Sequence, residues 1–214
     1  MKTENQKVSE NILLLKILEK DNNILGATKL QKQVFLNELK LDEMDAGGLY
    51  YKYFRYNYGP FSFQLQNSYN ILADKGFVHK TTYRLTDRGK YFIGYAEGCL
   101  ASYKNNSRIF ESVEETTQKY KRYNGTQLMR LVYDMAIAPV ENPTRRMKIK
   151  DIPAFTDLLR PECNSFEYEL KFPAHILEDF KEELAMDKDT WDNLEESQSP
   201  AIKKATHALA AALQ

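Results

Sequence analysis

The order in which helical and extended patterns alternate over residues 7–104 constrains the fold of this chain more than any other feature. The apolar residues of 8–20 predict a buried helix, and Thr28-Lys-Leu-Gln31 has the form of a capping box that begins a second one. The run from Tyr50 to Tyr58 is rich in aromatic side chains, which is typical of a β-strand, and Gly59-Pro60 is expected to end it. The chain is therefore predicted to start with two helices and an aromatic strand.

A helix and a hairpin are predicted next. Ser62 is expected to start a third helix that ends at Lys75-Gly76, where Gly76 suits the left-handed position that often follows a helix. Residues 77–85 predict two short strands around a tight turn, and Thr86 caps a fourth helix that runs to about residue 104. Three helices followed by a hairpin is the order of a winged helix-turn-helix, here with an extra strand between helices two and three.

The pattern becomes mainly helical after residue 105, so we expect a winged-helix domain over residues 1–105 and a second region over residues 106–214. Residues 165–172 alternate apolar and charged side chains, which predicts one half-buried strand in that region. The predicted fold class is α+β and mostly helical, with an N-terminal winged helix-turn-helix and a helical C-terminal region. Its helices are predicted at residues 108–122, 126–137, 153–160, 173–186 and 199–213.

Charge is unevenly divided along the chain, although 30 basic and 30 acidic side chains give a formal net charge of zero. Residues 1–160 contain 25 Lys and Arg against 18 Asp and Glu, and residues 161–214 contain 5 against 12. The balance gives no general argument for nucleic-acid binding. Any DNA contact should therefore lie before about residue 150, and the acidic end should contact a protein partner or the chain's own basic part.

Motifs of the first half resemble a known family. Residues 28–36, Thr-Lys-Leu-Gln-Lys-Gln-Val-Phe-Leu, resemble the TKLQKLxFL helix of the YwgA-like proteins, and residues 56–62, Tyr-Asn-Tyr-Gly-Pro-Phe-Ser, resemble their Y-x-Y-G-P-[FY]-S turn. Residues 72–89 resemble the wing motif of many winged helices, and residues 125–133 resemble a later helix of the family. The likeness covers about residues 10–135, and the Panacea (SocA-like) antitoxins are a more distant one. It implies a winged-helix core and assigns no catalytic residue.

In a winged helix, the third helix enters the major groove of DNA and a few of its side chains read base edges. Helical geometry places Asn67 and Asn70 on the outward face, with Gln66 at its edge, and such amides can bind adenine. Phosphate contacts are predicted at Lys75, Lys80, Arg84, Arg88 and Lys90, and are possible at Lys29, Lys32, Arg145, Arg146 and Lys148. The leading hypothesis is a regulatory or defence-associated protein that binds double-stranded DNA as a homodimer.

Other residues favour a protein partner. Phe63 lies on the outward face of the same helix, which carries no Lys or Arg, and Asp74 there would repel phosphate. An acidic helix surface could bind a basic partner, screen the chain's basic part, or be merely solvated; it consists of Glu178, Asp179, Glu182 and Glu183. The alternative hypothesis is an antitoxin-like module that binds a partner protein without reading DNA sequence.

The tyrosines of residues 50–58 have two interpretations. They could stack on single-stranded bases, but packing on both faces of the strand is favoured, and some could lie at a dimer interface.

Motifs of hydrolases, nucleotide-binding loops and zinc sites are absent from the sequence, and its three histidines are not at metal-ligand spacings. We therefore expect no enzyme activity, no metal and no cofactor. No apolar run approaches the roughly 20 residues that span a bilayer, and no secretion signal is evident. A cytoplasmic protein, with Cys99 and Cys163 as reduced thiols, is expected.

Overall fold

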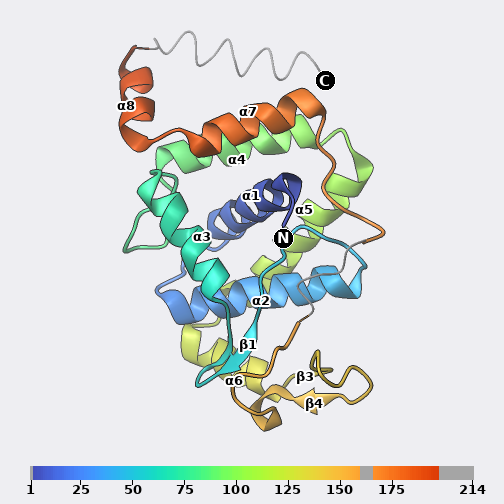
Figure 1. Cartoon of the computed structure of the whole chain (residues 1–214). Coiled ribbons are helices and arrows are strands. Elements are labelled where there is room, and N and C mark those ends of the chain that lie inside the picture. Colours follow the sequence, from blue (N-terminus) through green and yellow to red (C-terminus); the bar gives the residue numbers. More distant parts are fainter. Residues whose placement is uncertain (1, 160–165, 198–214) are drawn as a thin grey trace.

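The computed structural model describes residues 2–159 and 166–197, which are mostly helical with two small sheets (Figure 1). This confirms the α+β, mostly helical prediction. The helices are α1 (Glu4–Lys20), α2 (Ala27–Glu43), α3 (Phe63–Asp74), α4 (Asp87–Leu100), α5 (Lys104–Lys121), α6 (Gly125–Asp134), α7 (Ala174–Ala185) and α8 (Lys188–Ser197). The strands are β1 (Phe54–Tyr56), β2 (Gly59–Phe61), β3 (Ala136–Ile137) and β4 (Met147–Lys148), and a 3₁₀ turn, η1, covers Ile149–Asp151.

Helix α1 lies at the centre of the core. Thr3 caps its first turn by accepting from the Gln6 N–H, while the Gln6 side chain accepts from the Thr3 N–H. All seven residues from Ile12 to Leu18 are buried, because α2, α4, α5 and α7 pack around this helix. A helix that is apolar on all sides needs such enclosure, and Figure 1 shows α1 between the α4–α7 pair and α2.

Helix α2 starts differently from the prediction. Its N-cap is Gly26, with no side-chain capping bond, and Thr28 already lies within the first turn, so the capping box predicted at Thr28 is wrong. Gln31 bonds to Ser62 instead: its amide nitrogen donates to the Ser62 carbonyl (3.0 Å), and its side-chain oxygen accepts from the Ser62 N–H (2.8 Å). Both residues are buried, so water does not reach the backbone N–H and carbonyl of Ser62, and the Gln31 side chain serves as their partner.

The aromatic run forms only a short strand. β1 pairs antiparallel with β2, so that Phe54 faces Phe61 and Tyr56 faces Gly59. The first strand ends at Tyr56, before Gly59-Pro60 as predicted, but Gly59-Pro60 itself begins a second strand that was not predicted. Tyr50 and Tyr53, which precede β1, are buried, as is Tyr51 between them, which confirms the packing interpretation for these rings. It is wrong for Tyr56 and Tyr58, which are 37% and 62% exposed.

Residues 155–158 run along the other side of β1. The Arg55 N–H donates to the Thr156 carbonyl (2.9 Å), and the Leu158 N–H donates to the Tyr53 carbonyl (2.9 Å). The helix predicted at residues 153–160 is therefore wrong over its described part, because the extended pairing with β1 prevails over the local pattern.

Helix α3 and the hairpin after it follow the prediction closely. Ser62 caps α3 through the Leu65 N–H, and Gly76 has a φ of 80°, the left-handed conformation that glycine adopts readily. Residues 77–85 form a hairpin with a single bridge, between Val78 and Leu85, in place of two regular strands. Thr86 caps α4 as predicted, and α4 ends at Leu100, short of residue 104.

The C-terminal region agrees only in part. α5, α6 and α7 occur near their predicted positions, but α6 ends at Asp134 because the chain turns into β3, which was not predicted. α8 and β4 were not predicted either. The strand predicted at residues 165–172 is reduced to one bridge between Tyr168 and Ala46. The helix predicted at residues 199–213 lies outside the described residues.

We expect Gln31→Leu to lower the free energy of unfolding by about 2–4 kcal/mol, because it removes the acceptor of the buried Ser62 N–H and one of the two donors to the Ser62 carbonyl. Urea unfolding followed by circular dichroism measures this change. Gln118→Leu, at an exposed position of α5, is the matched control and should change stability by less than about 0.5 kcal/mol. Equal losses in the two variants would contradict the role given to Gln31.

Candidate functional site

Six of the predicted DNA-contacting residues lie at the surface of α3, the 77–85 hairpin and the start of α4. Only Leu65, Tyr69 and Leu72 of α3 are buried, so the opposite face of this helix points to solvent. Asn67, Asn70, Lys80, Arg84 and Lys90 are exposed and Gln66 is half-buried. The structure thus brings together the amides of α3 and three cations of the adjoining segment.

The hairpin is held rigidly against α3. The Tyr83 ring stacks on the Tyr69 ring with centroids 4.7 Å apart, and the Tyr69 hydroxyl donates to the His79 carbonyl (2.7 Å). Tyr83 has a φ of 55°, which is strained for a non-glycine residue, and such strain is concentrated at functional sites. Arg84 follows directly and is exposed, and its carbonyl accepts from the His79 N–H (2.8 Å), so the hairpin backbone from which this side chain extends is held in place.

Two of the three cations have nearby carboxylates. Lys80 pairs with Asp74 at 3.1 Å and Lys90 pairs with Asp87 at 2.8 Å, and all four side chains are largely exposed. Lys90 lowers the pKa of Asp87 by hydrogen bonding and by its charge. Exposed pairs of this kind are weak, so phosphate groups can replace the carboxylates as partners of the two lysines.

Arg88 and Lys75 do not have the predicted role. The Arg88 side chain is only 2% exposed and donates to the carbonyls of Lys75 (2.6 Å) and Glu183 (2.8 Å), and its guanidinium lies over the Phe77 ring. Lys75 donates to the Ala185 carbonyl at the end of α7. Both cations are thus bonded to backbone carbonyls, those of α7 included. The prediction of a phosphate contact at Arg88 is wrong, because α7 and α8 pack over this side of α4.

The predicted acidic surface on α7 is divided. Glu178, Asp179 and Glu182 are exposed, whereas Glu183 is half-buried and lies 3.4 Å from Arg88. Burial raises the pKa of Glu183, and the charge of Arg88 opposes that shift. The acidic end therefore makes an intramolecular contact with a basic residue, one of the two roles expected for it.

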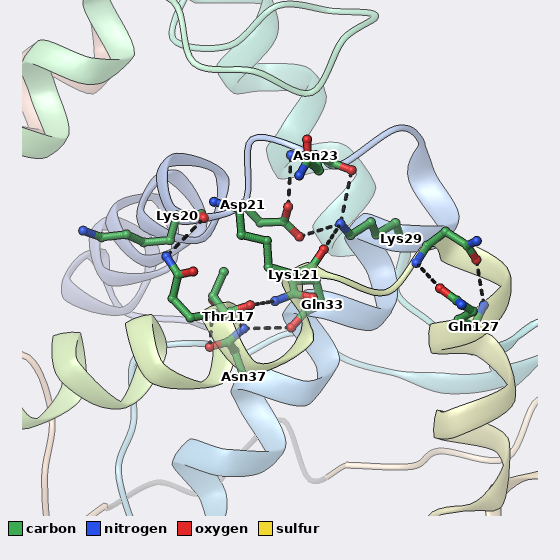
Figure 2. Close-up of polar contacts among 11 residues, drawn as sticks. Lys20, Asp21, Asn23, Lys29, Gln33, Asn37, Thr117, Lys121 and Gln127 are labelled. Carbon is green, nitrogen blue, oxygen red and sulfur yellow. Dashed lines mark hydrogen bonds and ion pairs between the residues drawn. The ribbon is translucent and has the colours of Figure 1, made fainter.

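Lys29 and Lys32 are also structural. The Lys29 ammonium lies 2.8 Å from the Asp21 carboxylate and donates to the carbonyls of Asn23 (3.1 Å) and Lys121 (2.9 Å). Figure 2 shows these contacts. Lys32 donates to the Pro60 carbonyl (2.8 Å), and burial lowers its pKa to about 8. Both side chains are buried, so the phosphate contacts considered for them are excluded by position.

The basic hairpin of β3 and β4 remains accessible. Arg145, Arg146 and Lys148 are exposed, and Arg146 donates to the Ala136 carbonyl (2.8 Å). Figure 1 places this hairpin at the opposite end of the molecule from the junction of α3 and α4. These three residues are therefore separated from the amides of α3.

A surface of five aromatic rings lies at the N-terminal end of α3. Neighbouring ring centroids are 5.1 to 6.0 Å apart, and the rings come from β1, β2, α3 and the 155–158 segment. Phe63 and Phe155 are each 69% exposed. We call this set the aromatic surface; it consists of Phe54, Tyr56, Phe61, Phe63 and Phe155. The sequence indicated only Phe63, because Phe155 reaches β1 through backbone pairing distant in sequence.

Two carboxylates are buried beneath the segment that leads to β1. Glu10 accepts from the Tyr50 N–H (3.0 Å) and from Lys2, while one oxygen of Glu38 has no hydrogen-bond partner. Burial raises the pKa of Glu38 well above its usual range, and the nearby charge of Glu10 raises it further. Burial also raises the pKa of Glu10, against the effect of Lys2. Both carboxyl groups are therefore expected to favour their protonated form more strongly in the folded chain than in the unfolded one.

Among the described residues, no group of three or more His, Cys, Asp or Glu side chains is arranged to hold a metal ion. Within the same part of the chain, no helix has both the length and the apolarity needed to cross a membrane. Comparison with known proteins found no matching family model, no matching curated protein and no matching solved structure.

We expect Arg88→Ala to lower the free energy of unfolding by about 3 kcal/mol or more, because it leaves several buried carbonyls and Glu183 without a donor. Lys90→Ala, two residues along the same helix and exposed, is the control and should leave the urea midpoint unchanged. If Arg88→Ala unfolds at the wild-type midpoint, Arg88 does not hold α7 to α4.

Glu38→Gln should remove part of the pH dependence of stability. The pKa of Glu38 is raised in the folded state, so its favourable contribution is complete below the unfolded pKa and is lost as pH rises through the folded value. The advantage of the Gln variant over wild type should therefore grow with pH above about 4.5, as measured by urea unfolding at a series of pH values. A constant difference across the series would show that Glu38 does not change its protonation on folding.

Proposed function

We propose that this chain binds double-stranded DNA through the outward face of α3 and the 77–85 hairpin, as a winged-helix protein. The observation that supports this most directly is the exposure of Asn67, Asn70 and Arg84 on adjoining elements, one of which is a helix with a solvent-facing side. Helices α1, α2 and α3 precede the 77–85 hairpin, which is the order of a winged helix apart from the β1–β2 pair before α3. The motif resemblance to the YwgA-like proteins supports the same core.

The amides support a preference for A·T base pairs. Asparagine binds the N6 and N7 edge of adenine, and apolar side chains contact the thymine methyl group. Asn67 and Asn70 are exposed, and Ile71 beside them is 50% exposed. Gln66 donates to the Asn70 side chain (3.3 Å), which orients that amide before any base is bound.

Electrostatic attraction should be modest. With Arg88, Lys29 and Lys32 buried, the cations of this face are Lys80, Arg84 and Lys90. Three phosphate contacts predict a slope of about −3 when the logarithm of the binding constant is plotted against the logarithm of salt concentration.

The proposal is tested by fluorescence anisotropy with a random-sequence duplex over a series of salt concentrations. Wild-type protein should bind at low salt with the slope given above. Arg84→Ala should weaken binding about fivefold and reduce the slope by about 1 on all sequences, because it removes one phosphate contact. Lys40→Ala, an exposed lysine at the far end of α2, is the control and should bind like wild type.

A double variant, Asn67→Ala with Asn70→Ala, distinguishes recognition of the bases from electrostatic attraction to the phosphates. It should keep most binding to random duplex and lose the preference for A·T-rich over G·C-rich duplexes. Absence of wild-type binding at low salt, or equal weakening by Arg84→Ala and Lys40→Ala, would contradict the proposal.

A further inference from the structure

The backbone conformation of Phe155 keeps part of the aromatic surface exposed. Phe155 has a φ of 65°, a strained conformation for an aromatic residue, and its N–H donates to the Arg55 carbonyl (2.7 Å). The pairing with β1 holds this conformation and leaves the ring 69% exposed, stacked on Phe54 at 5.9 Å. A strained backbone conformation persists only where the surrounding structure enforces it, so the pairing with β1 determines the exposure of Phe155.

The surface has the area that contact with a second copy requires. Phe63 and Phe155 are each 69% exposed and Tyr56 is 37% exposed. At roughly 200 Å² for a whole aromatic side chain, these three expose roughly 350 Å² per copy. Two copies would thus bury roughly 700 Å² from these rings alone, and the half-buried Phe54 and Phe61 with polar neighbours bring the total near the roughly 1,000 Å² of a specific interface.

The charges near the rings are of both signs. Lys52 is exposed, and its N–H donates to the Gln64 side chain (3.1 Å), next to Phe63. Asp157 is exposed and bridges to Phe54 across the sheet. A strongly charged partner gains little here, whereas a self-complementary contact brings no large charge of one sign against itself.

Strand addition does not explain the surface. β1 pairs with β2 on one side and with residues 155–158 on the other, so both of its edges are occupied. β1 therefore offers no free edge to a partner, and the exposed feature of this surface is its rings, a side-chain type enriched at the centres of protein interfaces.

We propose that the aromatic surface is the interface of a homodimer, in which the rings of two copies pack against each other. The inference does not rest on DNA binding: the surface lies at the N-terminal end of α3 and the 77–85 hairpin beyond its C-terminal end, although Phe63 lies one turn before Asn67 on the same helix. The small area makes a weak dimer whose population depends on protein concentration.

Sedimentation velocity over a wide range of protein concentration tests this inference. Wild type should shift from monomer to dimer as concentration rises, at low and at high salt alike, because the contact is apolar. The double variant Phe63→Ser with Phe155→Ser should stay monomeric throughout. Leu25→Ser is the matched control: Leu25 is 85% exposed in the loop between α1 and α2, and its replacement should leave the dimer intact.

Circular dichroism and the thermal midpoint establish that each variant is folded. Phe155→Leu keeps an apolar side chain and should therefore dimerise more than the double serine variant does, though less than wild type. A wild-type protein that is monomeric at every concentration would overturn the inference, as would a dimer that the double variant retains. The inference would also be overturned if wild type is monomeric and binds another protein, and the double variant loses that binding. This outcome would favour the antitoxin-like alternative.

Discussion

The burial of polar side chains on α2 is the constraint on which the rest of the structure depends. Lys29, Gln31, Lys32, Gln33 and Asn37 all lie inside the molecule, where a polar group without a partner is costly. Together they bond to three parts of the chain: the end of α1, helix α5 and the segment from Pro60 to Ser62. Lys29 binds the end of α1 and the end of α5, and Gln33 and Asn37 bind Thr117 of α5 (Figure 2). The hydrogen bonds of these buried side chains therefore hold α2 against several other segments of the chain at the same time.

The same bonds position the candidate sites. Gln31 holds both backbone groups of Ser62, the residue that caps α3, and Lys32 holds the carbonyl of Pro60 in β2. The start of α3 and the strand beside it are thus anchored to one helix. The direction of the outward face of α3 and the placing of the aromatic surface both follow from these bonds, which explains why the two motifs that resemble the YwgA-like family lie against each other.

The division of charge along the chain has a structural cause. Glu183 of the acidic end pairs with Arg88, the carbonyls of Glu183 and Ala185 accept from Arg88 and Lys75, and Lys29 pairs with Asp21. Two cations of residues 1–160, Arg88 and Lys75, thus bond to α7 in the acidic end, and Lys29 is neutralised within residues 1–160. The exposed cations near α3 are few, so the DNA binding that we propose would depend on amides for its specificity.

Short-range signals in the sequence determined the mostly helical fold class, the caps at Ser62 and Thr86, the glycine at position 76 and the outward placing of Asn67 and Asn70. These depend on residues a few positions apart, so local backbone geometry is sufficient to predict them. Only the tertiary structure decided that the Gln31 side chain bonds to Ser62 and does not cap its own helix. The same is true of the pairing of residues 155–158 with β1 and of which lysines and arginines reach the surface. Each of these outcomes depends on a partner distant in sequence, because a buried donor bonds to whichever carbonyl or carboxylate the packing brings to it.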